Sequence, residues 1–217
     1  MTDDSDCRSW FSAADLLTND ETAPVALIGA PLGLGSITPG RCDLAPETVR
    51  AALRRMSVYD VETETDLSTL RVFDAGDIPI QTLEPADARD PLVDRLDPLL
   101  QNHALVIVLG GNNAVTRPCI HALDQNSGVA GLLTLDAHFD LRDTDCGLTN
   151  GNPIQALLED GMPGTRVAQV GLLAFANTKK AHEKAKAAGI HVVTMRECEP
   201  VYPRSDGERG FVEACLE

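Results

Sequence analysis

The chain has 217 residues, a formal net charge of -15 and a hydrophobic content of 43%, and aromatic residues make up only 4%. This length suits one large α/β domain or two small ones, with a core built mainly from Leu, Val, Ile and Ala. The acidic balance argues against nucleic-acid or anionic-membrane partners, which need a basic surface. The sequence contains no run of 18 apolar residues, so no membrane span is predicted. The acidic start lacks a signal-peptide pattern, and we therefore expect a cytoplasmic protein.

Strands and helices are predicted to alternate after an acidic N-terminal stretch. Residues 1–22 are polar and predict a flexible arm, and residues 23–217 are expected to form one domain. The predicted strands are residues 25–29, 71–74, 104–109, 129–135, 167–171 and 190–194, and the predicted helices are 46–56, 86–102, 116–125, 152–159 and 179–188. This alternation predicts a three-layer α/β/α fold with a mainly parallel sheet, in which ligands bind beyond the carboxyl ends of the strands.

Three metal-binding side chains follow the strand predicted at 129–135. Asp136, His138 and Asp140 stand at every second position, and alternation along an extended chain puts such positions on one side. Two carboxylates and an imidazole then converge at the rim of the sheet, and these ligands suit manganese, iron or zinc. The alternative is a cluster of solvated turn residues. Cys146 is nearby, but the six cysteines are scattered and are expected to be free thiols.

Two further turns at predicted strand ends carry amide side chains. The glycine pair at 110–111 allows a sharp bend, after which Asn112 and Asn113 face either a ligand or the start of the next helix, where Asn is a common N-cap. Asn150 and Gly151 form a turn before a helix, and the turn either has no further role or brings an amide to the metal site.

The glycine-rich segment at 29–35 follows the first predicted strand. It matches neither the dinucleotide-binding nor the P-loop pattern, and no helix begins until residue 46. We therefore expect a loop on the substrate side of the site. Only the α/β alternation and this poorly matching glycine loop would favour the interpretation as a dinucleotide-binding protein.

These motifs together resemble the ureohydrolase family of arginases, agmatinases and formimidoylglutamases, over residues 25–194. The motifs that carry the resemblance are Gly40-Arg41, Pro46-Glu47 with Arg50, Gly76-Asp77, the pair at 110–111 and the complete Asp-Ala-His-x-Asp motif at 136–140. Phe139, Leu141 and Arg142 make that last motif closest to the formimidoylglutamase form. The resemblance implies a homo-oligomeric hydrolase with two manganese ions, in which a hydroxide held between them attacks a guanidino or formimino carbon.

The resemblance also implies roles for individual residues. Asp136 would bridge both ions, His138 would bind one and Asp140 the other, and Asp140 would act as the catalytic residue that hydrogen-bonds the hydroxide. Asn113 stands in the place of a family His ligand. Because an amide oxygen is a weaker ligand than imidazole, one of the two metal positions should be weakened.

The same resemblance assigns substrate binding to three residues. Asn150, followed by Gly151, replaces a His found in arginases and agmatinases but not in formimidoylglutamases, so formimidoylglutamate is the best substrate prediction. Arg142 would pair with a substrate carboxylate, since its planar fork suits one. The alternative is a surface arginine near an acidic cluster.

Part of the family's pattern is missing from the chain. The second metal motif of the family, Asp-x-Asp-x-x-Asp, does not occur after Thr194, and the family places its seventh and eighth strands between the third and fourth. We therefore expect these residues to be the front two-thirds of a longer polypeptide, with the strand Leu105–Leu109 left exposed. A catalytically impaired relative that keeps the fold is the competing hypothesis, and an agmatinase- or arginase-type activity is a further alternative.

Overall fold

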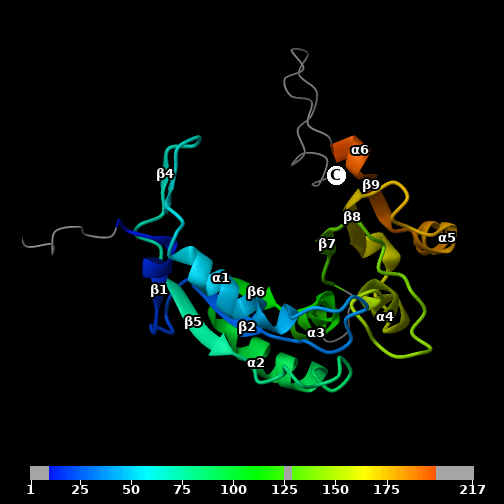
Figure 1. The fold of residues 1–217 in the computed structure, drawn as a ribbon, viewed down its shortest axis with the longest axis horizontal. Coiled ribbons are helices and arrows are strands. Elements are labelled where there is room, and N and C mark those ends of the chain that lie inside the picture. Colours follow the sequence, from blue (N-terminus) through cyan, green and yellow to red (C-terminus); the bar gives the residue numbers. More distant parts are fainter. Residues whose placement is uncertain (1–9, 125–128, 199–217) are drawn as a thin grey trace, which may run out of the picture.

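The computed structural model describes residues 10–124 and 129–198, which form two α/β lobes (Figure 1). The N-terminal lobe, residues 10–123, contains a four-stranded parallel sheet, and the C-terminal lobe, residues 132–198, contains a three-stranded one. The predicted α/β alternation is confirmed. In the described ranges, no helix has both the length and the apolar character that crossing a membrane requires.

The sheet of the N-terminal lobe has the strand order β1-β5-β2-β6. Its strands are β1 (Leu17–Thr18), β2 (Val25–Ala30), β5 (Val72–Asp77) and β6 (Leu105–Gly110). Every residue of β2 is buried, because helices cover both faces of the sheet and β2 has a neighbour on each side. Figure 1 shows α1 and α2 on opposite faces, and the helices of this lobe are α1 (Ala45–Leu53), α2 (Arg89–Asn102) and α3 (Thr116–Leu123).

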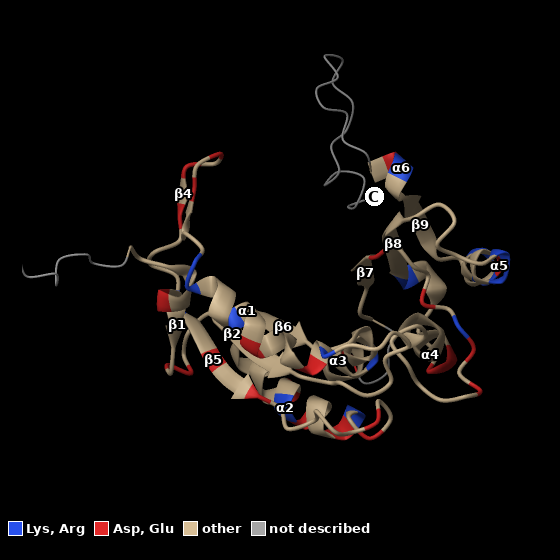
Figure 2. Cartoon of the chain, in the orientation of Figure 1, with Lys and Arg blue, Asp and Glu red and all other residues tan. Residues whose placement is uncertain are grey.

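The sheet of the C-terminal lobe has the order β7-β8-β9. Its elements are β7 (Leu132–Leu135), α4 (Pro153–Glu159), β8 (Val167–Leu172), α5 (Lys179–Ala188), β9 (His191–Thr194) and the short α6 (Met195–Cys198). Helix α5 begins where the Thr178 hydroxyl accepts a bond from the amide of Ala181 (3.1 Å), and it ends at Gly189, whose φ of +76° suits glycine. Figure 2 shows that several Lys positions lie together on the ribbon of α5.

The described strands form two separate parallel sheets, where the sequence analysis predicted a mainly parallel sheet that lacks the family's central strands. β6 is the edge of one sheet and β7 the edge of the other, and no described strand lies between them. Leu105 of β6 is 54% exposed and Leu135 of β7 is 67% exposed. The expectation that the apolar strand at Leu105–Leu109 would be uncovered is therefore confirmed, because a strand needs neighbours on its edges and faces to bury such residues.

The predicted flexible arm does not extend over residues 10–22. The Asp15 carboxylate fixes the start of the 3-10 helix Ala13–Leu16, because it accepts bonds from the hydroxyl and the amide of Ser12 (2.8 and 2.7 Å). The next two residues form β1, which pairs in parallel with β5. The remainder of the predicted arm, residues 1–9, lies outside the described residues.

A short antiparallel ribbon was also missed. Strands β3 (Tyr59–Asp60) and β4 (Thr65–Asp66) project from the N-terminal lobe, as Figure 1 shows. Their residues are exposed and mostly polar, so the period-2 pattern of a half-buried strand is absent from the sequence.

Asp160 links the two lobes at the interface of α3 and α4. Arg117 of α3 donates two hydrogen bonds to its carboxylate (2.6 and 2.8 Å), and the buried His121 contacts it through Nε2 at 2.9 Å. The other ring nitrogen of His121 accepts a bond from Arg89 of α2 (2.9 Å), which fixes the neutral tautomer with the proton on Nε2. Burial of the ring is the main reason why the pKa of His121 is lowered.

Arg50 holds α1 against the carboxyl end of β5. Its guanidinium donates to both oxygens of Asp74 (2.9 and 2.8 Å), to Asp77 (2.6 Å) and to the carbonyl of Gly76 (3.2 Å). Gly29 of β2 is required beside this network, since a Cβ there would lie 1.8 Å from an Asp77 oxygen. The motif residues Arg50 and Gly76-Asp77 therefore have a structural role at the strand ends.

We expect Arg50→Met to destabilise the N-terminal lobe by on the order of 1–3 kcal/mol, because two carboxylates lose their charged donor in a half-buried position. The matched control is Arg54→Met, one turn further on and exposed. Urea unfolding followed by circular dichroism measures the difference. Equal midpoints for the two variants would contradict the structural role of Arg50.

Candidate functional site

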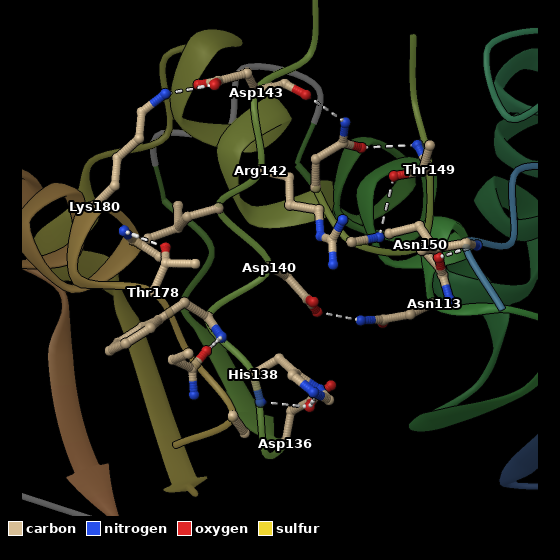
Figure 3. A pocket seen from close by; sticks show the side chains of 18 of the residues that line it. Asn113, Asp136, His138, Asp140, Arg142, Asp143, Thr149, Asn150, Thr178 and Lys180 are labelled. Carbon is tan, nitrogen blue, oxygen red and sulfur yellow. Dashed lines mark hydrogen bonds and ion pairs between the residues drawn. The ribbon is translucent and has the colours of Figure 1, made fainter. Parts of the chain in front are cut away.

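A cavity of about 730 Å³ lies at the carboxyl ends of β7 and β8, between the two lobes. Figure 3 shows side chains of both lobes directed into it. The structure brings together every residue predicted for the site, and these are Asn113, Asp136, His138, Asp140, Arg142, Asn150 and Gly151. Their predicted functional roles are a separate matter and remain predictions.

The segment 136–140 reaches the cavity through a turn. β7 ends at Leu135, and the amide of Asp136 adds one more bond to the ladder by donating to Val170 (3.0 Å). The Asp136 carboxylate then accepts a bond from the amide of His138 (2.8 Å), which bends the chain, and Asp140 has a φ of +52°. The three side chains line one cavity, but a turn replaces the expected extended strand, and their predicted convergence on a single metal ion stays a prediction.

Asp140 is the most perturbed acid of the site. Burial and the neighbouring Asp136 carboxylate raise the pKa of Asp140 to about 7, against the opposing effects of a bond from Asn113 and the charge of Arg142. Two carboxylates at the end of one strand repel each other in a half-buried position. A divalent cation between them would remove that repulsion, so the arrangement suits such an ion.

Asn113 faces Asp140 with its nitrogen. Its Nδ2 donates to the Asp140 carboxylate, as Figure 3 shows, while its Oδ1 accepts a bond of 2.7 Å from the Thr116 hydroxyl. Coordinating a metal through Oδ1 would therefore require the amide to turn over and lose both bonds. A His at this place would present a ring nitrogen instead of an amide.

Asn112 caps the helical segment that follows, as one of its two interpretations predicted. Its Oδ1 accepts a bond from the amide of Ala114 (2.9 Å), and its Nδ2 donates to the carbonyl of Leu34 (2.6 Å). The bend before it needs glycine, because a Cβ on Gly111 would lie 2.2 Å from the carbonyl oxygen of Leu32. The 110–113 turn is thus fixed to the loop after β2.

Arg142 and Gly151 lie against each other on the cavity wall. The amide of Arg142 donates to the carbonyl of Gly151 (3.2 Å), and a Cβ on Gly151 would lie 3.0 Å from the Arg142 side chain. Figure 3 shows the guanidinium extending into the cavity toward Asn113 and Asn150. Asn150 uses its side-chain oxygen to accept a bond from Ile37 (2.9 Å), so it holds the loop that follows residues 29–35 at the cavity.

The opposite wall comes from α5 and was missed by the sequence analysis. Lys180 contacts the Asp143 carboxylate at 2.5 Å, and Lys184 contacts it at 2.8 Å. Hydrogen bonds from these two lysines lower the pKa of Asp143 to about 2. Lysines on an exposed helix give no sequence signal of their own, because most such lysines are solvated.

The described residues do not by themselves form a metal site. Asp136, His138 and Asp140 provide oxygen and nitrogen donors of the kind that manganese accepts. Within residues 10–124 and 129–198, however, no three or more His, Cys, Asp or Glu side chains form a group that would hold an ion by themselves. Cys146 is exposed and lines the cavity, and nothing places its thiol among these donors.

The fold and this site define an α/β protein with carboxylate and imidazole donors at the ends of parallel strands. The chain belongs to the arginase family, whose model matches residues 23–205. Among curated relatives, a formimidoylglutamase of Halalkalibacterium halodurans is 35% identical over 175 residues, and one of Bacillus subtilis is 33% identical over 174 residues. These alignments cover 79% and 78% of this chain but only 55% and 54% of the relatives, so the chain spans about half their length.

Solved structures give the same assignment of the fold. The crystal structure of Bacillus subtilis formimidoylglutamase has a TM-score of 0.79 at 29% identity, and the alignment covers 88% of this chain and 61% of that one. A Trypanosoma cruzi formiminoglutamase with Mn²⁺₂ has a TM-score of 0.71 at 26% identity, covering 82% of this chain and 62% of that one. The predicted arginase-like fold and the predicted family are therefore confirmed.

We expect Asp140 to make the metal-free chain less stable as pH rises. The pKa of Asp140 is raised in the folded state, so the unfolded chain loses this proton first, from its ordinary value of 3.8 upward, and stability falls until pH passes about 7. Thermal unfolding of chelator-treated protein between pH 4 and pH 8 measures this. Asp140→Asn should lose less stability than the wild-type chain over that window, and parallel curves would count against the assignment.

Proposed function

We propose that this chain is the site-bearing part of a manganese-dependent hydrolase that cleaves linear C–N bonds in guanidino or formimino compounds, with formimidoylglutamate as the preferred substrate. The observation that carries the proposal is the meeting of Asp136, His138, Asp140 and Arg142 in one cavity at the strand ends. Membership of the arginase family and the likeness to formimidoylglutamases support it.

Asp136, His138 and Asp140 would hold the metal, and Asn113 would complete the set only after its amide turns over. Bound manganese would supply a Lewis acid and a water of lowered pKa. The Asp140 carboxylate accepts a hydrogen bond from Asn113, and it is positioned to accept one from an attacking water in the same cavity.

Arg142 is the residue that we assign to substrate selection. Its guanidinium extends into the cavity, and a planar fork of donors binds a carboxylate through two parallel bonds. Formimidoylglutamate carries carboxylates and agmatine carries none. An arginine in this position therefore favours formimidoylglutamate as the substrate. The bond from the Ile37 amide to Asn150 holds the loop at residue 37 beside the same wall.

A catalytically impaired relative is the second candidate, and one observation favours it. The Asn113 oxygen is already bonded to Thr116, so the described residues leave one metal position without its family imidazole. For the whole protein, we further propose a cytoplasmic homo-oligomer without a nucleic-acid partner, which fits a net charge of -15.

We expect the purified chain to bind manganese and Asp136→Ala to lose that binding, as measured by metal analysis after gel filtration. About two ions per wild-type chain, together with formimidoylglutamate hydrolysis that disappears in His138→Ala, would support the hydrolase. If the loaded wild-type chain binds manganese but releases no product, the impaired relative is the better account.

Replacing Asn113 by His separates the two candidates further. If this position is the weakened one, Asn113→His should tighten manganese binding by about tenfold or more, because imidazole is the stronger ligand. Titration calorimetry measures the affinity, and Asn113→Gln serves as the control that keeps an amide. Unchanged affinity in both variants would remove Asn113 from the ligand set.

A further inference from the structure

The segment 136–140, which carries the proposed metal donors, is bonded to the rest of the protein through the residues between those donors. Asp136, His138 and Asp140 face the cavity, whereas the two residues between them, Ala137 and Phe139, are bonded to the protein through their backbones. Asp136 and Asp140 also have backbone bonds of their own, to Val170 and from Gln155. The position of His138 between them depends on the contacts of its two neighbours.

Asn177, in the loop between β8 and α5, hydrogen-bonds to the backbones of both intervening residues with its one side chain. Its Oδ1 accepts a bond from the amide of Phe139 (2.9 Å), and its Nδ2 donates to the carbonyl of Ala137 (2.8 Å). The backbone on either side of His138 is thereby tied to a single amide group. The amide orientation follows from these two partners, since turning it over would lose both bonds.

Phe139 has two further attachments. The buried Gln169 of β8 donates a bond of 3.0 Å to its carbonyl, and its ring is 5% exposed and stacks on His182 of α5 at 5.7 Å. Amide, carbonyl and ring are thus all held immediately before Asp140. Because Asp140 has a φ of +52°, which non-glycine residues rarely adopt, the next backbone unit needs such support.

We propose that Asn177 is a positioning residue that sets the spacing of His138 and Asp140 for metal binding, with Gln169 as its partner on the other side of Phe139. Asn177 lines the same cavity as the donors but is not itself assigned as a ligand. This inference rests on the proposed function for the identity of the metal, while the ordering of segment 136–140 stands independently of it.

The chemistry of the contact explains why asparagine occupies this place. One acceptor and one donor, at the distance of a single amide, match an N–H and a C=O two residues apart. Aspartate keeps the acceptor for Phe139 but loses the donor to Ala137 and adds a third negative charge near Asp136. Alanine loses both bonds and leaves the Phe139 amide without this acceptor, while the Ala137 carbonyl keeps the bond from the Leu173 amide (3.1 Å).

Two measurements on the full chain test the proposal, with Asn177→Ala as the variant. Hydrogen exchange of the Phe139 amide in metal-free protein should accelerate by about tenfold or more, because its acceptor is gone. Manganese affinity, measured by calorimetry, should fall by about tenfold or more, as is usual when a group that orients a metal ligand is removed.

Thr178→Ala is the matched control. Thr178 is the next residue in the same loop and also lines the cavity, but its hydroxyl accepts the cap bond of α5 from the amide of Ala181 (3.1 Å). This control should lose stability from the missing cap, yet keep the Phe139 exchange rate and the manganese affinity within about twofold.

The outcomes separate this inference from the proposed function. Equal Phe139 exchange in Asn177→Ala and wild type, or equal acceleration in Thr178→Ala, would overturn the ordering role. Faster exchange with unchanged manganese affinity would overturn the positioning role. If the wild-type chain binds no manganese but the exchange result holds, the ordering of the segment is supported and the proposed function fails.

Discussion

The pairing of β7 with β8 is the constraint on which the candidate site depends. The register places Leu135 opposite Val170, and the amide of Asp136 extends the ladder by one bond before the chain turns. At this point Gly171 has a φ of +95°, and a Cβ there would lie 3.5 Å from the Asp136 carbonyl oxygen. A register shift of one residue would carry the donors to the other face of the sheet.

The site also depends on how the two lobes meet, because Asn113 comes from one and Asp140 from the other. Their bond crosses the interface, and the contacts of Arg117 and His121 with Asp160 cross it between α3 and α4. These links are polar, and one apolar side chain joins them, because Ile120 of α3 belongs to the core cluster of the C-terminal lobe. Directional bonds and this apolar contact therefore both hold the lobes around the cavity.

Local sequence patterns predicted a large part of this arrangement. The apolar runs predicted β2, β6 and β8 closely, and the Asp-Ala-His-x-Asp motif predicted donors that do line one cavity. Glycine and asparagine signals at 110–113 predicted a bend and a cap, since those properties belong to the backbone of a few consecutive residues. The same reasoning failed for β1 and for the β3–β4 ribbon, whose exposed or two-residue strands leave no periodic pattern.

The sequence by itself therefore determined the alternation of elements, the Asp-Ala-His-x-Asp motif and the family. Only the tertiary structure decided which strands pair in each sheet, that the nitrogen of Asn113 faces Asp140, and that Asn177 bonds to the backbone of segment 136–140. The reason is physical. A strand's neighbours, an amide's orientation and a bond between Asn177 and Phe139 depend on partners distant in the chain, and no local pattern encodes them.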